Sequence, residues 1–448
     1  MITQRSIPYL INSQSYFEKI RHLGHAVYLD SGRPKCPWGR YDIISAAPIE
    51  LLELNSEDAD AFKQLDALYK KYRTDTVQNE EIPFQGGIIG HFAYDLGRSL
   101  EQLPSLAADF STLPDMRVGM YLWAIVTDHE KQTSTLIADA RTDLETLKTI
   151  EALLTADTIA PDQPTPFQLA RRFSANMDAN SYQEKLNQVD EYIHSGDCYQ
   201  VNFAQRFDSQ YKGDPWEAYK ALREVAPTPY SAFIDSGTDQ ILSLSPEQFL
   251  ESKMQRVTTK PIKGTRPRSS DPIKDAQLKQ ELSDSLKDRA ENLMIVDLLR
   301  NDLSKVCTYN SVEVPKLFNI ESYANVHHKV STVTGTLDPK HSPISLIAEC
   351  FPGGSITGAP KIRAMEIIEE LEPHRRSIYC GSIGYISLCG RMDTSITIRT
   401  LLCQDNNIFC WAGGGIVADS INEMEYEETF DKVNNLLHCL ETTIPKES

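Results

Sequence analysis

The chain has 448 residues, and its 45 Lys and Arg against 63 Asp and Glu give a formal net charge of −18. Its length predicts two or three domains at roughly 150 residues each, and its 41% hydrophobic and 24% charged residues exclude a disordered chain. The excess of acid argues against nucleic acids and anionic membranes as partners, because both need clustered positive charge. A small anionic substrate stays open, since one pocket can be basic.

No targeting signal is recognisable in the sequence. The N-terminus lacks the apolar core of a signal peptide, and no apolar run approaches the ~20 residues that span a bilayer. Nine cysteines are scattered without a C-x-x-C pair, so neither a zinc site nor a disulfide framework is indicated. Reduced thiols and a cytoplasmic location are the simplest expectation.

A proline-rich seam divides the chain. Residues 155–167 hold three prolines among small and polar residues, as in an interdomain linker. We therefore expect a support or regulatory lobe at 1–154, a linker at 155–174 and the main domain at 175–448. In the first lobe, the apolar run Tyr121–Val126 predicts a buried strand.

The main domain shows strands grouped in hairpins and helices in separate blocks. Ser181 and Glu184 predict a capping box for a helix that Gly196 closes. Periodicity and turn residues predict strands at 198–207, 231–235, 240–245, 383–388, 394–402 and 408–413, and long helices at roughly 273–300, 358–371 and 420–440. This order favours an α+β fold with a large antiparallel sheet over a doubly wound parallel sheet.

Two residues outside the helices are candidates for covalent and acid–base chemistry. Lys263 stands directly before Gly264 after a strand-like segment, and a buried lysine with a lowered pKa is a nucleophile. Glu247 follows Pro246 after an apolar strand, and a carboxyl in an apolar pocket can act as a general acid. The plainer alternatives are a solvated loop lysine and a helix opened by Ser245-Pro246-Glu247.

Acidic residues on two of the predicted helices are candidates for a metal site. The first helix is apolar nearly all round from Leu293, so Asp297 is expected to be buried beside Arg300, with Glu291 at the entrance. On the C-terminal helix, Glu425, Glu428 and Lys432 share a face away from the core. They indicate either Mg²⁺ ligands with a basic neighbour or an ordinary surface ion pair.

Two glycine-rich runs and one arginine are candidates for anion binding. The runs 351–361 and 411–420 offer successive backbone N–H groups, although the first lacks the lysine of a phosphate-binding loop, and tight turns are the plainer alternative. Arg399, predicted within a strand at 396–401, can clamp a carboxylate or form a cross-strand ion pair.

Taken together, these segments resemble the chorismate-utilising enzymes, in particular the aminodeoxychorismate synthase component I branch. The resemblance covers roughly residues 175–440 and rests on the strings SGDCYQVNFAQRF, SPEQFL, PIKGTRPR, DRAENLMIVDLLRND, FPGGSITGAPK and AGGGIV in the family's order. It implies a chorismate-binding catalytic domain at 175–448, in which two interleaved α/β subdomains pack antiparallel sheets as a sandwich with helices outside.

The resemblance also implies roles for individual residues. Lys263 and Glu247 would be catalytic, and Mg²⁺ would be held by Glu291 and Glu428, with Glu425 and Asp288 as further metal ligands. Chorismate would contact the following residues: Gln200, Thr265, His328, Thr357, Tyr385, Arg399, Gly413, Gly414, Gly415 and Lys432. Isochorismate and salicylate synthases carry a Lys in place of Gln200, and anthranilate synthases an Ala in place of Lys263.

The implied reaction starts with addition of the Lys263 amine to ring C2 while Glu247 helps the C4 hydroxyl to leave. Ammonia then adds at C4 and expels the lysine. None of the nine cysteines has the setting of an amidotransferase nucleophile, so a separate glutamine amidotransferase subunit is the expected ammonia donor. Anthranilate synthase component I and a catalytically silent ligand-binding partner remain the alternatives.

Overall fold

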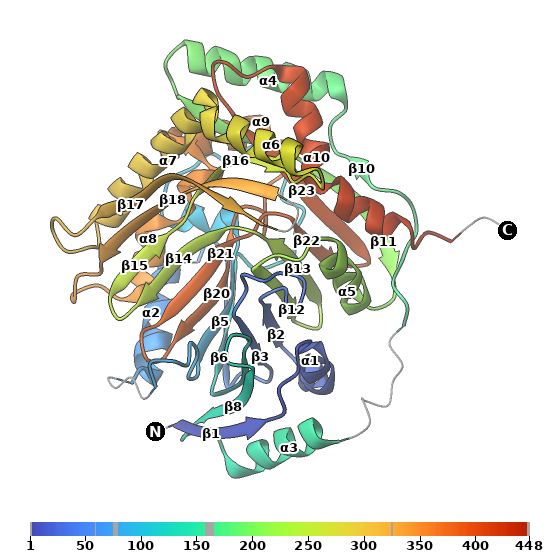
Figure 1. Ribbon diagram of the computed structural model, residues 1–448, viewed down its shortest axis with the longest axis vertical. Coiled ribbons are helices and arrows are strands. Elements are labelled where there is room, and N and C mark those ends of the chain that lie inside the picture. The colour runs from blue at the N-terminus through green and yellow to red at the C-terminus, as the bar shows by residue number, and fades with distance from the viewer. Residues whose placement is uncertain (1, 59, 75–78, 157–164, 324–325, 446–448) are drawn as a thin grey trace.

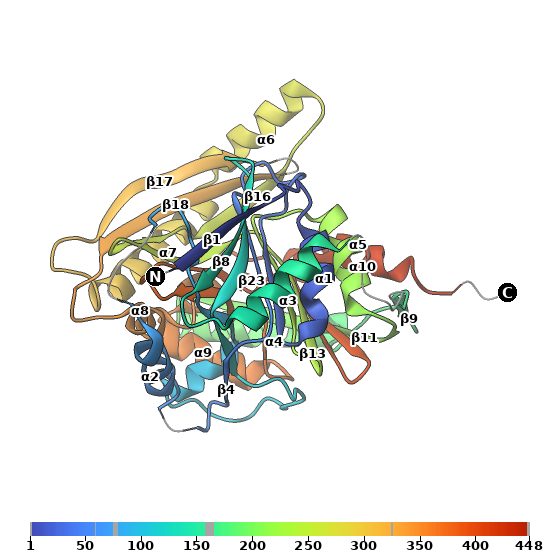
Figure 2. The same ribbon diagram turned by 90° about the horizontal axis from the view of Figure 1, so that it is seen from below.

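The computed structural model describes residues 2–58, 60–74, 79–156, 165–323 and 326–445. Within these ranges the strands form two sheets of 13 and 10 strands, and every pairing between named strands is antiparallel. The sheets pack face to face with helices outside (Figures 1 and 2). The predicted α+β fold with sandwiched antiparallel sheets is therefore confirmed.

The first sheet combines strands from both ends of the chain, in the order β1-β8-β7-β3-β2-β12-β13-β22-β23-β11-β10, with β9 and β19 also pairing with β11. Its strands are β1 (Ile2–Ile7), β2 (Ala26–Asp30), β3 (Tyr41–Ser45), β7 (Trp123–Asp128), β8 (Thr133–Asp139), β9 (Gln168–Leu169), β10 (Ser174–Ala175), β11 (Gln200–Lys212), β12 (Tyr230–Asp235), β13 (Asp239–Ser245), β19 (Gly358–Ala359), β22 (Thr400–Gln404) and β23 (Asn407–Ile416).

The second sheet has the order β16-β18-β15-β14-β21-β20-β5-β6-β4, with β17 also pairing with β18. Its strands are β4 (Glu50–Leu54), β5 (Gly87–Phe92), β6 (Met116–Tyr121), β14 (Gln248–Lys253), β15 (Arg256–Thr259), β16 (Ile262–Pro267), β17 (Glu313–Ser322), β18 (Val326–Thr336), β20 (Ser382–Ser387) and β21 (Met392–Ile396).

Alternation along the strands creates two cores. Val27 and Ile234 of the first sheet join Ile89 and Ile383 of the second in the apolar layer between the sheets. Residues on the opposite face of the first sheet pack under α1 (Gln14–Ile20), α3 (Leu144–Thr155), α5 (Pro215–Val225) and α10 (Asn422–Glu441).

The second sheet is flanked by α2 (Ala61–Tyr72), α6 (Pro272–Asp284), α7 (Leu286–Ser304) and α8 (Pro343–Cys350), while α4 (Ala179–His194) and α9 (Lys361–Leu371) cover β11. Three short 3₁₀ turns complete the chain: η1 (Arg21–Leu23), η2 (Tyr94–Ser99) and η3 (Gly354–Ile356).

Neither sheet is built from residues 1–154 alone. β2 pairs with β12 in the first sheet, and β5 pairs with β20 in the second, so both sheets cross the expected boundary at residue 154. Most of the proline-rich seam, residues 157–164, lies outside the described residues. Within the described part of the chain, no helix has the length and apolar character needed to cross a membrane.

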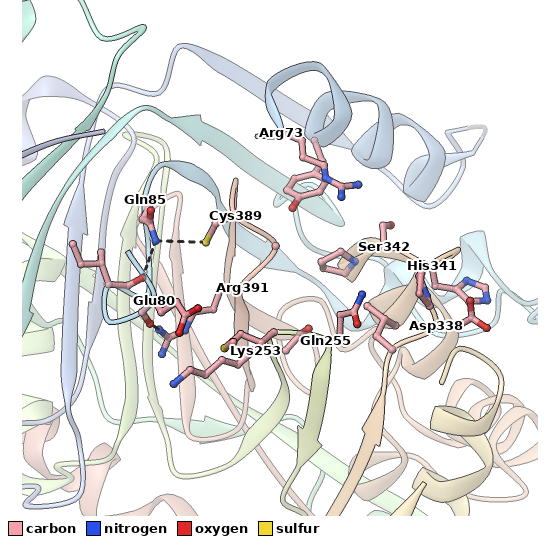
Figure 3. A pocket seen from close by; sticks show the side chains of 18 of the residues that line it. Arg73, Glu80, Gln85, Lys253, Gln255, Asp338, His341, Ser342, Cys389 and Arg391 are labelled. Carbon is pink, nitrogen blue, oxygen red and sulfur yellow. Dashed lines mark hydrogen bonds between the residues drawn. The ribbon is translucent and has the colours of Figure 1, made fainter. Parts of the chain in front are cut away.

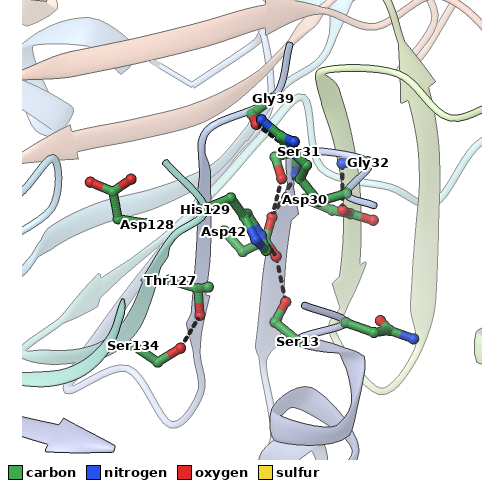
Figure 4. A network of polar contacts seen from close by, with 12 residues as sticks. Ser13, Asp30, Ser31, Gly32, Gly39, Asp42, Thr127, Asp128, His129 and Ser134 are labelled. Carbon is green, nitrogen blue, oxygen red and sulfur yellow. Dashed lines mark hydrogen bonds and ion pairs between the residues drawn. The ribbon is translucent and has the colours of Figure 1, made fainter. Parts of the chain in front are cut away.

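A buried carboxylate fastens the N-terminal segment to the first sheet. Asp42 on β3 accepts hydrogen bonds from the hydroxyls of Ser13 and Ser31, at 2.6 Å each, and from His129 Nε2 at 2.8 Å (Figure 4). These hydrogen bonds favour the ionised form and keep the pKa of Asp42 below its usual value against the opposing effect of burial.

Several element boundaries differ from the predictions, each because a local interaction competes with periodicity. Asp178, not Ser181, caps α4, since its side chain accepts from Ser181 N. The helix expected over 273–300 breaks at Ser285, whose side chain caps α7. The helix expected from 358 begins only at Lys361, because Gly358 and Ala359 pair with β11. The run Tyr121–Val126 is shared by β6 and β7, which lie in different sheets.

Candidate active site

Lys263 is aimed by an irregularity in β16. Ile262 lies opposite Val330 of β18 and Thr265 lies opposite His328, so Lys263 and Gly264 together oppose a single residue. This two-against-one arrangement is a β-bulge, which turns the bulged strand and re-aims a side chain. Gly264 has φ +87°, a conformation that side-chain-bearing residues rarely adopt.

The amine of Lys263 is held inside the protein and not in solvent. Lys263 Nζ donates a hydrogen bond to the carbonyl of Ser355 at 2.8 Å. Burial lowers the pKa of Lys263, and the carboxylates of Glu291 and Glu247 only partly oppose this. The geometry therefore excludes the solvated loop lysine considered above, and burial shifts Lys263 in the direction of the neutral amine.

Glu247 and Arg399 lie where the chain crosses between the sheets. Glu247 follows β13 of the first sheet and precedes β14 of the second, and Arg399 links β21 of the second sheet to β22 of the first. The crossings are adjacent, since Ile396 N donates to Glu247 O at 3.1 Å and Leu244 N to Arg399 O at 3.0 Å. Neither a helix at Glu247 nor a continuous strand through Arg399 forms; Arg399 has φ +52°.

Glu247 is 5% exposed. Burial raises its pKa, while a hydrogen bond with the Ser355 side chain and the charge of Lys263 act in the opposite direction. A carboxyl with a raised pKa can hold a proton near neutral pH and donate it. Ser355 thus contacts both candidate catalytic residues, through its carbonyl and its side chain.

Sequence reasoning did not single out Ser355. It lies in η3, in the glycine run that was considered as an anion-binding loop, and the only signal was its place among those glycines. Gly354 next to it packs against α7, since a Cβ there would lie 2.5 Å from Leu298 Cδ2. The glycine at 354 therefore lets the loop pack closely on α7, and this packing places Ser355 within hydrogen-bond distance of Lys263.

The acidic residues of α7 and α10 approach each other across the site. Among the described residues no group of three His, Cys, Asp or Glu side chains converges closely enough to enclose a cation. Glu425 accepts from Ser420 at 2.7 Å and Lys287 at 3.2 Å, and Asp288 is bonded to Arg266 at 3.4 Å. These two acids already have partners.

Glu291 and Glu428 are the other two acids of this group. Burial raises the pKa of Glu291, and the charges of Lys263 and Lys287 oppose this rise more than those of Asp288 and Glu425 add to it. Glu428 is bound by Lys432 at 2.5 Å. Mg²⁺ needs only one or two protein carboxylates when substrate oxygens and water complete its shell, so this donor set fits it.

Asp297 is not buried, contrary to the prediction. Its side chain is 60% exposed and pairs with Arg300 at 2.8 Å. The buried acid of α7 is Asp302, 1% exposed, which binds Lys361 at 2.7 Å. The buried side chains of α7 recur every three to four residues, as at Ile295, Leu299 and Leu303, so Asp302 lies on the buried face and Asp297 on the exposed one.

The second glycine run lines the site from β23. Lys432 Nζ donates to Gly413 O at 2.8 Å. A Cβ at Gly414 would point toward Glu425, Glu428 and Lys432, and a Cβ at Gly415 would lie 2.0 Å from Gln200 Nε2. The glycines therefore allow charged side chains of α10 and the amide of Gln200 to approach the strand backbone from its two faces.

Polar residues of β16, β18 and the η3 loop complete the group. Thr265 Oγ1 and His328 Nδ1 are 2.8 Å apart, and burial lowers the pKa of His328 to about 3, so its ring is neutral. Thr357 is fully buried, with its hydroxyl on Gly353 O at 3.1 Å. Arg399 forms no ion pair with any residue the structure describes, which leaves its guanidinium free for an anion.

A buried ion pair holds two of these segments together. Arg376, 1% exposed, binds Glu372 through Nη2 at 2.6 Å and Nε at 3.0 Å. It also donates to Ile356 O at 3.0 Å and to Asn202 O at 2.5 Å. The η3 loop is thereby fixed to β11, the strand that carries Gln200.

Tyr385 does not join this group. It lines a cavity of about 200 Å³ with Trp38, Tyr230 and Asp393, none of them a predicted site residue. A further cavity of about 270 Å³ lies at the C-terminal end of β14, whereas Glu247 lies at its N-terminal end (Figure 3). Its lining includes Arg391 and Cys389, and no predicted site residue lines it.

The chain is similar to proteins of known activity. The family model described as chorismate binding enzyme matches residues 24–438, which includes most of the expected N-terminal lobe. Aminodeoxychorismate synthase component 1 of Salmonella typhimurium is 47% identical over 446 residues, 96% of each chain. The protein of the same name from Escherichia coli is 47% identical over 442 residues, again 96% of each.

Anthranilate synthases are also similar in sequence, and an isochorismate synthase is similar in fold. Anthranilate synthase component 1 of Thermus thermophilus is 40% identical over 87% of this chain and 85% of its own. The crystal structure of anthranilate synthase component I from Streptococcus pneumoniae superposes with a TM-score of 0.79, at 32% identity, over 89% of this chain and 92% of that one. The menaquinone-specific isochorismate synthase of Escherichia coli shares the fold, with a TM-score of 0.75 at 17% identity over 98% and 94% of the chains.

Proposed function

The chain belongs to the family of chorismate binding enzymes, and from that premise we propose that it makes 4-amino-4-deoxychorismate from chorismate and ammonia. The observation that carries the proposal is the buried amine of Lys263, which shares Ser355 with Glu247. The two relatives at 47% identity, named aminodeoxychorismate synthase component 1, support this product over anthranilate.

The first half of the reaction needs Lys263 without its extra proton and Glu247 with one. Burial favours a neutral Lys263 amine and a protonated Glu247 carboxyl. The amine forms a bond to ring C2, the double bond shifts, and the C4 oxygen leaves as water with the proton of Glu247. The positive charge then lies on the lysine nitrogen, close to the carboxylate that has lost its proton.

In the second half of the reaction the ring double bond returns to its original position. Ammonia forms a bond to C4, the bond from C2 to Lys263 breaks, and the electron pair returns to the amine. The new ammonium at C4 returns one proton to Glu247, so the enzyme is regenerated. The net change is chorismate plus ammonia to aminodeoxychorismate plus water.

The remaining residues bind a dianion. Arg399 and Lys432 supply positive charge for the two carboxylates, and the glycines of β23 let the substrate approach the backbone. Mg²⁺ bound by Glu291 and Glu428 would neutralise a carboxylate and orient the ring. His328, being neutral, can donate or accept a hydrogen bond without adding charge.

The ammonia donor is proposed to be a second protein. The designation component 1 in the names of the relatives supports a partner component, and we take it to be a glutamine amidotransferase subunit. All nine cysteines are free, eight of them with thiol pKa values raised by burial, which argues against a nucleophilic cysteine for glutamine hydrolysis in this chain. Free thiols also support a cytoplasmic location.

The test is product identification with the purified chain, chorismate, Mg²⁺ and ammonium. Mass spectrometry distinguishes aminodeoxychorismate, which keeps the enolpyruvyl group, from anthranilate, which has lost it. Lys263→Ala should abolish amination at C4, whereas the matched control Lys260→Ala, just before β16, should retain it. Anthranilate as the main product, or undiminished aminodeoxychorismate from Lys263→Ala, would overturn the proposal.

A further inference from the structure

Tyr323, in the turn between β17 and β18, is held by both its backbone and its side chain. Its N–H donates a hydrogen bond to Val326 O at 2.7 Å, and its carbonyl accepts one from Arg268 Nη1 at 2.7 Å. Its hydroxyl donates to Glu321 Oε2 at 2.8 Å. Three hydrogen bonds from different atoms of one residue fix the place of its ring.

The ring of Tyr323 contacts two other aromatic rings. It meets His328 edge to face, with 5.4 Å between the ring centroids and 63° between the planes. It meets Trp38 in the same way, at 6.0 Å and 76°. Aromatic rings attract one another in this geometry. Trp38 lies in the loop between β2 and β3, so the N-terminal segment reaches a residue of the candidate site through a single ring.

The loop that carries Trp38 is closely packed. Arg33 Nε donates to Gly39 O at 2.8 Å, and a Cβ at Gly39 would lie only 1.9 Å from Ser31 O. The Trp38 side chain itself is 61% exposed. A fixed loop therefore presents a largely exposed indole to Tyr323.

His328 lies beside the bulge that aims Lys263. Thr265, which follows the bulge, is the partner of His328 in the register of β16 and β18, and its Oγ1 is 2.8 Å from His328 Nδ1. The charge of Arg399 adds to the effect of burial in lowering the pKa of His328, so the imidazole lies near the guanidinium proposed to bind a carboxylate. With Nδ1 engaged, Nε2 is the ring nitrogen left for chorismate.

We propose that Tyr323 is a positioning residue for His328 and that Trp38 supports it, an inference that rests on the proposed function. A single hydrogen bond at Nδ1 leaves the imidazole free to tilt about that bond. The Tyr323 ring opposes the tilt, so that Nε2 keeps one direction. A group oriented in advance does not have to be reoriented during the reaction, and the N-terminal segment contributes to this without contacting chorismate.

The first experiment measures kcat/KM for chorismate with ammonium as nitrogen source. Tyr323→Leu removes the ring and should lower kcat/KM roughly two- to ten-fold, the range that one aromatic pair supplies, while the KM for ammonia changes less than two-fold. Tyr323→Phe keeps the ring and should retain the wild-type value. Trp38→Leu should cause a smaller fall. The matched control is Tyr309→Leu, at a tyrosine that is 90% exposed, and it should have no effect.

A double-mutant cycle shows whether Tyr323 acts through His328. Once His328 is replaced by Ala, Tyr323→Leu should change kcat/KM by less than 1.5-fold, because the ring it orients is gone. If Tyr323→Leu has its full effect in the His328→Ala background, the two residues act independently and the proposal is overturned.

The second experiment does not depend on turnover. The ¹⁵N NMR signals of histidine-labelled protein report which ring nitrogen carries the proton, and His328→Ala assigns the signals of His328. We expect one neutral tautomer of His328 in the wild type and in Tyr323→Phe, and a mixture of both in Tyr323→Leu, because a tilted ring loses its fixed hydrogen bond to Thr265. The same single tautomer in Tyr323→Leu would overturn the proposal, even if kcat/KM falls, since hairpin packing alone would then explain the loss.

These outcomes separate the inference from the function on which it rests. If the wild-type chain aminates chorismate and Tyr323→Leu keeps both its kcat/KM and its single His328 tautomer, the inference is wrong and the proposed function stands. If the wild-type chain forms no aminodeoxychorismate, the proposed function fails, and the NMR comparison still decides whether Tyr323 orients His328.

Discussion

Replacing Arg376 by Met should destabilise the protein by more than the loss of its contacts suggests. The substitution removes donors from two buried backbone carbonyls and leaves the Glu372 carboxylate without its cation. Removing one partner of a buried ion pair typically costs about 3–5 kcal/mol. With an unfolding entropy on the order of 2.1 cal/mol/K per residue, about 0.9 kcal/mol/K for 448 residues, the melting temperature should fall by about 3–5 °C.

The pH dependence identifies the cause of this loss. Burial already raises the pKa of Glu372, against the effect of Arg376, and without the arginine it rises further. The folded variant then retains a proton that the unfolded chain releases above about pH 4.5. Its deficit relative to wild type should therefore grow as pH rises from 5 to 8.

The assay is thermal unfolding of Arg376→Met, Glu372→Leu and the double variant at pH 5 and pH 8. The double variant should lose less than the sum of the single losses at pH 8, because it leaves no uncompensated charge. Melting of Arg376→Met within 1 °C of wild type at pH 8, or a strictly additive double variant, would refute the reasoning.

Three further outcomes follow from the structure. Ser355→Ala should lower kcat by about ten-fold or more with little change in the chorismate KM, since one hydrogen bond to Glu247 is lost; Ser355→Thr should restore kcat, and equal losses in both would argue for packing alone. Glu428→Gln should raise the Mg²⁺ concentration needed for half-maximal turnover, measured by titration into chelator-treated enzyme, and an unchanged midpoint would exclude Glu428 as a ligand. Burial and the neighbouring Asp115 raise the pKa of Asp95 to about 7, so its folded state binds a proton that the unfolded state loses near pH 4. Wild-type stability should therefore decline from pH 4 to 7 more steeply than that of Asp95→Asn, and parallel melting curves for the two would contradict this.

The fold class and most strands of the main domain were predictable from the sequence, because alternation and turn residues act locally. The pairing partners were not. Nothing in the composition of β2 or β5 indicates that they lie beside β12 and β20. The proline-rich seam suggested a division of the chain, whereas pairing across it depends on contacts between residues far apart in sequence.

The candidate site was predicted in part. Lys263, Glu247, Glu291 and Glu428 lie together, and their roles stay predictions until tested. Arg399 was assigned to a strand because its neighbours alternate, but the chain changes sheet there and takes up a left-handed conformation. Asp297 was misplaced because the apolar residues around it suggest burial on all sides, whereas α7 buries only one face and leaves Leu293 and Asp297 exposed.

The shared sheets have a consequence for synthesis. The N-terminal strands form one continuous stretch of each sheet, the first ending at β2 and the second at β5. Each would present an unpaired edge until β12 or β20 leaves the ribosome, and exposed edges are templates for aggregation. A truncated chain ending near residue 154 would keep both edges permanently, so the first third of this protein depends for its solubility on residues made much later.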